Sequence, residues 1–369
     1  MTWARERARG APPATKGALV ALSLCAAVLL SAVTAQAQDV IFFRVGTGAT
    51  AGTYFPIGGL IASAISNPPG SRECERGGSC GVPGLIAVAQ STSGSVANVE
   101  GIASGTLESG LSQADIAYWA HTGTEIYRKR GQVPKLRAIA NLFPESVHLV
   151  VSRASGIESI ADLRGKRISI DREGSGTRVD ALLILHAFGV AQQDFEAHAL
   201  PVGQAADLLR AGELDGFFFV AGTPANAIEQ LAAENLIALV PINGPAVDDL
   251  LLGHPFFARA SISSGTYFNI PQTETLSVGA QWLVSAEVSE DLIYEVTRAL
   301  WHESTRQLLD GGHPKGRLIR IETALDGLGV PLHPGAERYY EEIGALIGDM
   351  TADEAGGVMP ERNAAPGTQ

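Results

Sequence analysis

Two turns rich in glycine and small hydroxyl residues are best suited to bind a small ligand. The first is Gly46–Pro56, with the sequence GTGATAGTYFP, and the second is Gly174–Thr177, with the sequence GSGT. Each follows an apolar run typical of a strand and precedes a pattern typical of a helix. Such a turn leaves the first backbone N–H groups of the helix unpaired, beside small hydroxyls. Because these groups bind an anion without a side-chain cation, two such turns predict two lobes that face one small acidic ligand.

The composition is that of an acidic, packed globular protein. The chain has 369 residues, of which 46% are hydrophobic and 18% charged, enough for one large or two medium domains. The formal net charge of −12 argues against nucleic acid or an anionic membrane as a partner, because both would repel this chain. Repeated strand–helix units, such as the apolar run Leu85–Gln90 before a further Ser/Gly/Thr turn, predict parallel α/β sheets.

The N-terminal segment has the features of an export signal. Basic residues precede an apolar run, Ala18–Val33, and the triplet Ala35–Ala37 is typical of a cleavage site. We expect a signal peptide over 1–37, cleaved near Ala37, and a periplasmic mature protein. An uncleaved membrane anchor is the alternative, for which the apolar run is slightly short. The Gly/Ala/Pro-rich segment 350–369 is expected to be a disordered tail.

Two cysteines remain after such a cleavage, Cys74 and Cys80, in a glycine-rich loop. In an exported protein, an even pair at this spacing predicts a disulfide. A metal site that uses both cysteines is the alternative, but no histidine is near them in the sequence, and the eight histidines show no paired spacing. The sequence therefore predicts no metal ion and no cofactor.

Two motifs resemble those of enzymes but lack the required context. The segment Gly46–Gly52 is one residue longer than a dinucleotide-binding fingerprint, and the acid at the expected distance, Glu73, lies in the cysteine loop. The segment Gly77–Gly81 matches the nucleophile-elbow pattern around Ser79, but no strand precedes it. We therefore expect that the protein is not an enzyme. A secreted serine hydrolase that uses Ser79 or Ser175 is the alternative, and it would need a histidine base beside the serine.

Five segments, taken in order, resemble the TAXI family of TRAP-transporter solute-binding proteins. No single segment is specific to that family, but the ordered set is. The segments are Gly46–Pro56, Ser93–Asn98, Ser155–Arg167, Gly174–Thr177 and Leu214–Gly222.

This resemblance implies a type II periplasmic-binding-protein-like α/β fold, with two lobes and a ligand cleft at the hinge. It also implies capture of a small acidic solute, such as glutamate, 2-oxoglutarate or a related dicarboxylate or amino acid, and delivery to a TRAP permease. We expect one lobe over 40–147 plus 266–349 and the other over 148–265, joined by crossover strands near His148 and Ser261–Thr266. An exported, sensor-associated binding protein without a permease is the alternative within the same class.

The candidate ligand-binding residues lie at predicted strand ends, where open α/β sheets bind ligands. From the first lobe we expect Thr50, Gly52, Thr53 and Tyr54, with Ser95 and Asn98 from the next helix start. From the second lobe we expect Ser175, Gly176, Thr177 and Gly222. The resemblance adds Gln113 and Trp119, which flank a strand predicted over Asp115–Trp119.

Three alternatives for these side chains stay open. Each hydroxyl taken alone is also explained as an ordinary helix N-cap. Trp119 is equally explained by core packing. Arg178, the cation adjacent to the second turn, is either a solvated helix residue or a clamp for the ligand carboxylate.

Overall fold

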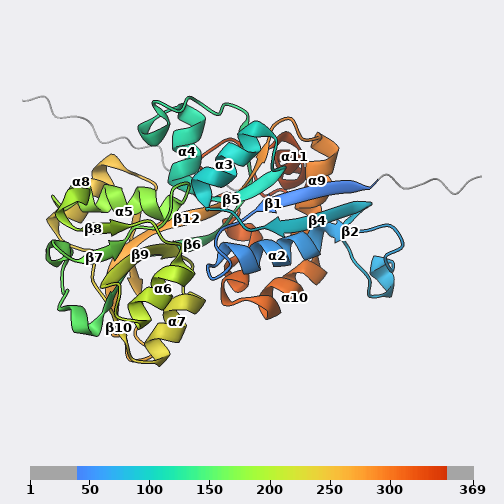
Figure 1. Ribbon diagram of the computed structural model, residues 1–369. Coiled ribbons are helices and arrows are strands. Elements are labelled where there is room, and N and C mark those ends of the chain that lie inside the picture. Colours follow the sequence, from blue (N-terminus) through green and yellow to red (C-terminus); the bar gives the residue numbers. More distant parts are fainter. Residues whose placement is uncertain (1–39, 347–369) are drawn as a thin grey trace, which may run out of the picture. The chain divides into compact units, whose positions relative to one another are not determined.

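Figure 1 shows the computed structural model of the protein, which describes residues 40–346. The predicted signal peptide, 1–37, and the predicted disordered tail, 350–369, lie outside the described residues. Within the described part, strands and helices alternate around one large sheet. The mixed α/β fold class predicted from the sequence is therefore confirmed.

Eight strands follow one another across the sheet in the order β4-β1-β5-β12-β6-β9-β7-β8, and two further strands pair at its sides. The strands of this path are β4 (Leu85–Gln90), β1 (Ile41–Gly46), β5 (Ser109–Gln113), β12 (Thr273–Ser285), β6 (Leu136–Ser152), β9 (Gly216–Ala221), β7 (Arg167–Ser169) and β8 (Glu196–His198). The side strands are β10 (Ile237–Leu239) on β6 and β11 (Ala258–Ile262) on β12, and a separate short pair is β2 (Ser66–Asn67) with β3 (Val82–Pro83).

Two groups of parallel strands are joined by an antiparallel pair. We call β4, β1 and β5 the first half-sheet and β9, β7 and β8 the second half-sheet. Strand β6 pairs with β12 along its first part and with β9 along its last part. Strand β12 pairs with β11 at its start and with β5 at its end. Both central strands therefore belong to both halves.

Within residues 40–346, ten α-helices cover the two faces of the sheet (Figure 1). Around the first half-sheet, one buried apolar cluster includes helices α2, α9, α10 and α11, and another includes α3 and α4. Around the second half-sheet, one cluster includes α5 and α8, and another includes α6 and α7. The bounds are α2 (Tyr54–Ile65), α3 (Ser95–Ser104), α4 (Ala114–Thr122), α5 (Gly176–Ala187), α6 (Val202–Arg210), α7 (Asn226–Ala233), α8 (Pro245–Gly253), α9 (Glu290–Leu300), α10 (Glu303–Gly312) and α11 (Pro334–Glu342).

The division into lobes at 147/148 and 265/266 stays a prediction. Separate apolar clusters on the two half-sheets support it. The two half-sheets are nevertheless continuous, because hydrogen bonds connect them through β6 and β12.

The strand predicted over Asp115–Trp119 is wrong. The strand is β5, which ends at Gln113, and helix α4 begins at the next residue. The apolar residues of α4 recur at helical spacing, with Ile116 and Ala120 both buried on one face. Strand β5 consists mostly of small and polar residues, so its full burial was not visible in its composition.

The predicted disulfide between Cys74 and Cys80 is confirmed, in the loop between β2 and β3. His302, far away in the sequence, also lies here, with a ring nitrogen within 4.8 Å of the two sulfurs. Because the sulfurs are bonded to each other, neither is a thiolate that would ligate a metal ion.

Among the described residues, none of the helices is both long enough and apolar enough to cross a lipid bilayer.

Replacing Cys80 by Ser tests the contribution of the disulfide. The bond closes a small loop, so we expect the free energy of unfolding to fall by only about 2 kcal/mol. Urea denaturation of both proteins, purified under oxidising conditions, measures this difference. A Ser104→Ala variant, altered on the exposed end of α3, is the control and should unfold like the wild type. A loss above about 4 kcal/mol would show that the loop is part of the main core.

Candidate functional site

A cavity of about 50 Å³ lies where the starts of α2, α3 and α5 meet the end of β9. Eight of the twelve predicted ligand-binding residues line it, although they come from distant parts of the chain. They are Gly52, Thr53, Tyr54, Ser95, Gln113, Ser175, Gly176 and Thr177. The two turns that the sequence singled out therefore face one space.

Helices α3 and α5 present backbone donors at this cavity. In the first turns, the N–H of Ala97 donates to the carbonyl of Gly174 at 3.0 Å, and the N–H of Arg178 donates to Ser175 Oγ at 3.0 Å. The preceding N–H groups, at Ser95 on α3 and at Gly176 and Thr177 on α5, have no acceptor among the described residues. Such groups carry the positive end of the helix dipole and favour an anion.

Three hydroxyl groups of the site also make structural hydrogen bonds within or between elements of the protein. Ser175 Oγ caps α5, which is the ordinary N-cap role left open by the sequence. Thr177 Oγ1 accepts from the N–H of Val220 at 3.0 Å and so ties α5 to β9. Thr53 Oγ1 donates to the carbonyl of Gly222 at 3.2 Å, which connects α2 with the end of the second half-sheet.

A buried tyrosine–glutamate pair forms one wall, and sequence reasoning missed its glutamate. Tyr54 donates its hydroxyl to Glu145 Oε2 at 2.6 Å. Glu145 lies on β6 and is 2% exposed, and burial raises its pKa to about 8 against the opposing effects of Tyr54 and the charge of Lys315. Burial likewise raises the pKa of Tyr54. The signal available in the sequence was the one acid within the largely apolar strand β6.

Asp171 is the second acid of the lining that the sequence did not indicate. It follows the end of β7, and its backbone φ of 66° is a left-handed conformation that residues other than glycine rarely adopt. Burial raises the pKa of its carboxyl group. Its position between β7 and the Gly174–Thr177 turn, three residues before Gly174, was the signal that could have identified it. No lysine, arginine or histidine from the described part of the chain lines this cavity.

Gln113 is held in one orientation at the floor of the cavity. Its side-chain oxygen accepts from Ser95 Oγ at 3.1 Å, and its side-chain nitrogen donates to Asp180 Oδ2 at 2.7 Å. The backbone of α5 comes very close to this amide, because a Cβ atom added at Gly176 would lie 1.4 Å from Gln113 Oε1. Only glycine therefore fits at the first residue of α5.

Four predicted residues do not line this cavity. Thr50 is exposed in the turn before α2. Asn98 is fully buried behind the wall, where its amide donates to the carbonyls of Thr47 and Leu111 at 2.6 and 2.7 Å. Gly222 packs against Thr53 and Lys315. Their roles in ligand binding stay predictions, but the contacts of Asn98 are structural.

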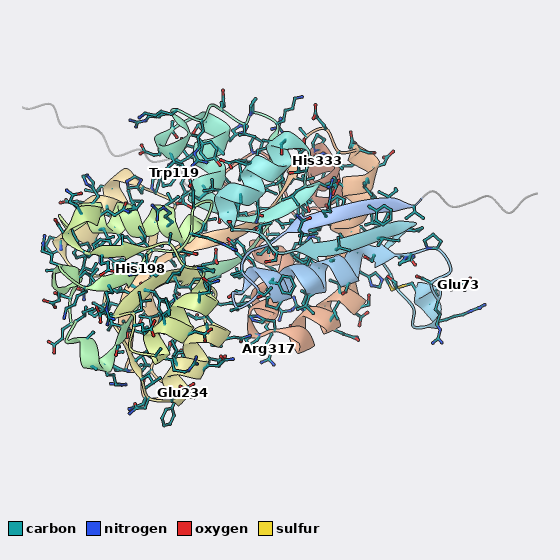
Figure 2. All side chains as sticks on the ribbon, viewed as in Figure 1. Glu73, Trp119, His198, Glu234, Arg317 and His333 are labelled. Carbon is teal, nitrogen blue, oxygen red and sulfur yellow. A yellow bond between two sulfur atoms is a disulfide. The ribbon has the colours of Figure 1, made fainter. Side chains whose placement is uncertain are left out.

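The fourth such residue, Trp119, lies on α4 (Figure 2) and lines a second cavity of about 380 Å³. Its ring is 5% exposed and contacts the ring of His254 edge-on, with centroids 5.9 Å apart. Arg178 lines the same second cavity. Its guanidinium therefore does not face the cavity formed by the two turns.

Neither serine of the hydrolase alternative is hydrogen-bonded to a histidine of the described residues. Ser175 lies beside a cavity whose lining, in the described residues, includes no histidine. Ser79 and His302 line one cavity, but Ser79 donates to the backbone carbonyl of Ser66, and Nδ1 of His302 is bonded to the hydroxyl of Ser304. His148, which the sequence placed in an apolar strand, is 1% exposed and bonded to the carbonyl of Phe219 and the hydroxyl of Tyr267. It is a structural histidine of the core.

The chain belongs to the NMT1-like family, which matches residues 45–344. Among solved structures, it is similar to the alkanesulfonate-binding protein SsuA from Xanthomonas axonopodis pv. citri bound to MOPS, with 17% identity over 83% of this chain and 85% of that chain and a TM-score of 0.45. It is also similar to MatC from Rhodopseudomonas palustris with bound malate, with 14% identity over 84% and 98% of the two chains and a TM-score of 0.49. PhnD1 from Prochlorococcus marinus in complex with methylphosphonate matches with 14% identity, over 83% and 98%, and a TM-score of 0.46.

Replacing Gly176 by Ala tests the close approach of α5 to Gln113. The added methyl group must displace the amide and break its bonds to Ser95 and Asp180, so we expect a loss of about 1–3 kcal/mol in the free energy of unfolding. Urea denaturation measures the loss. The matched control is Gly59→Ala in α2, where a Cβ would meet no neighbour within 4 Å. It should be neutral or stabilise by up to about 1 kcal/mol. Equal effects of the two substitutions would contradict this geometry.

Proposed function

We propose that this protein is an extracytoplasmic solute-binding protein that captures a small acidic solute and delivers it to a TRAP-type membrane permease. One observation carries the proposal: unpaired N–H groups at the starts of α3 and α5 face one cavity between the two half-sheets. A carboxylate placed there would accept charge-assisted hydrogen bonds. The resemblance of the five segments supports the TRAP permease as the partner, and the leader over 1–37 supports periplasmic localisation with cleavage near Ala37.

The two acids of the lining narrow the class of solute. If one carboxylate of the solute lies at the helix starts, Glu145 and Asp171 face the rest of the solute. An amino acid such as glutamate would place its α-carboxylate at the helix starts and its ammonium group near these acids, so that both of these charges would be matched. A dicarboxylate such as 2-oxoglutarate would instead need Glu145 in its protonated form, as a hydrogen-bond donor. We favour the amino acid, because its ammonium group would match Asp171 as well as Glu145, whereas Asp171 would repel a second carboxylate.

We propose binding without chemical change. The lining offers hydroxyls, amides, backbone donors and acids, but no nucleophile paired with a base. Release would follow from separation of the two half-sheets about the central strands, as in hinge closure around a ligand. A sensor-associated binding protein without a permease has the same site, so uptake of labelled solute by cells that carry or lack the permease genes distinguishes the two roles.

Calorimetry of the purified protein with glutamate, 2-oxoglutarate and succinate tests the binding function. We expect one site per chain, recovery of the solute unchanged, and tighter binding of the amino acid than of the two dicarboxylates. Chemical conversion of the solute, abolished by Ser175→Ala, would instead reveal an enzyme. Absence of binding to every carboxylate and amino acid would refute the proposed solute class.

The variant Glu145→Gln distinguishes an ammonium ligand from a dicarboxylate. Glutamine removes the negative charge but keeps the shape and an acceptor for Tyr54. If Glu145 faces an ammonium group, the binding free energy should become less favourable by about 1.5–3 kcal/mol, the usual contribution of a hydrogen bond to a charged group. If it donates to a second carboxylate, affinity should change little.

The control for this series is Arg178→Ala, because Arg178 lines the other cavity. Its effect on affinity should stay below about 0.5 kcal/mol. A loss above about 2 kcal/mol would mean that the guanidinium clamps the solute carboxylate after all.

A further inference from the structure

Two aspartates meet below the cavity, and each belongs to a different half of the protein. Asp115 lies in the first turn of α4, beside the first half-sheet, and Asp180 lies in the second turn of α5, beside the second half-sheet. Both side chains are 0% exposed. Asp180 accepts from the side-chain amide of Gln113, two residues before Asp115, at 2.7 Å, and each of the two carboxyl groups perturbs the ionisation of the other.

Most of the oxygens of this pair have no hydrogen-bond donor. Both side-chain oxygens of Asp115 and one oxygen of Asp180 are buried without a partner among the described residues. The remaining oxygen of Asp180 accepts from the side-chain amide of Gln113. Neither acid forms a salt bridge in the described part of the chain. Two ionised carboxylates in this environment would be strongly unfavourable, because burial and mutual repulsion both oppose ionisation.

A single proton between the two carboxyl groups would give an orphaned oxygen its hydrogen-bond donor and would remove the repulsion between two buried negative charges. A protonated carboxyl is a donor, so it supplies the hydrogen that an orphaned oxygen lacks, and it leaves one negative charge instead of two. Other pairs of adjacent carboxyl groups in proteins share one proton in the same way, because both groups cannot ionise side by side.

We propose that Asp115 and Asp180 share one proton across the two half-sheets, and that this pair positions Gln113 for the solute. The inference rests on the proposed function for its second part only. With the shared proton in place, Asp180 accepts from the amide nitrogen of Gln113, so the amide oxygen faces Ser95 and the cavity. Loss of that proton leaves two like charges on α4 and α5, which separates the helices and releases Gln113.

The charges around the pair come from several packed elements. Glu145 on β6 lies near both acids: its charge raises the pKa of Asp180, and the charge of Asp115 raises the pKa of Glu145. Tyr54 on α2 is close to Asp115 and donates to Glu145. Lys315, on the short helix η6 (Pro314–Leu318), acts on Glu145. Asp171, beside Arg172 and Arg178, lines the cavity above.

Burial raises the pKa of Asp115 to about 6 and raises the pKa of Asp180, to which the charge of Asp115 also contributes. A carboxyl whose pKa is higher in the folded state keeps a proton that the unfolded chain has lost. Stability is therefore greatest below the unfolded pKa near 4 and falls as the pH rises through the folded pKa. The expected window of falling stability runs from about pH 4 to beyond pH 6.

The variants Asp180→Asn and Asp115→Asn test the shared proton, because each amide supplies a permanent hydrogen donor in place of the titrating one. Thermal melting of the solute-free protein is measured from pH 5 to pH 8. We expect the melting temperature of the wild type to fall across this range. In each variant, the decrease in melting temperature should be at most half as large. At pH 8, each variant should therefore melt at a higher temperature than the wild type. Asp249→Asn, on the exposed side of α8, is the control and should follow the wild type.

Parallel pH profiles of the wild type and both variants would overturn the shared proton. Stabilisation of the wild type by added calcium or sodium, abolished in Asp180→Asn, would also overturn it, since the orphaned oxygens would then hold a metal ion. If one variant fails to fold, the other still decides the question.

A comparison of the variants Asp180→Asn and Asp180→Leu tests whether Asp180 positions Gln113. Asn keeps an acceptor for the Gln113 amide and Leu removes it, so Asp180→Leu should weaken solute affinity at least tenfold, while Asp180→Asn should stay within threefold of the wild type. Equal affinities of the two folded variants would refute the positioning role. If the wild type binds no solute, the proposed function fails, and the melting profiles still test the shared proton.

Discussion

The two long antiparallel strands β6 and β12 are the constraint on which the rest of the structure depends. Each belongs to both half-sheets, so the parallel strands on either side have a fixed register relative to the same backbone. The cavity lies beside this central pair, and β6 contributes Glu145 to it directly. A substitution that shifted β6 by one residue would move Glu145 to the other face of the sheet and would leave Tyr54 without its acceptor.

Local sequence determines the backbone donors of the site, and this is why they were predictable. A Ser/Gly/Thr turn between a strand and a helix has unpaired N–H groups wherever it occurs, so Ser95, Gly176 and Thr177 could be identified without the fold. The disulfide was equally local, because Cys74 and Cys80 are six residues apart. The side-chain oxygens of Ser175 and Thr177 follow from the same turn.

The acids of the site were not predictable in this way. Glu145, Asp171 and Asp180 acquire their properties from elements that approach them in the folded protein. Asp180 is one residue of a helix whose sequence does not show that α4 from the other half covers it. The wrong strand over Asp115–Trp119 had a different origin, because the helical spacing of Ile116 and Ala120 was already present in the sequence.

Polar contacts between the halves are compatible with the proposed function, in which the halves separate to admit a solute. Thr53 donates to Gly222, Ala97 to Gly174, Arg172 to Thr92 and Gln113 to Asp180, each across the boundary between the half-sheets. When the halves separate, water replaces these bonds, and the net cost of each is only about 1 kcal/mol. The cavity of about 50 Å³ is small, so under the proposed function a solute of several heavy atoms would enter while the halves are apart. Solute binding and the shared proton of the aspartates then act on the same equilibrium, because both favour the state in which α4 and α5 are in contact.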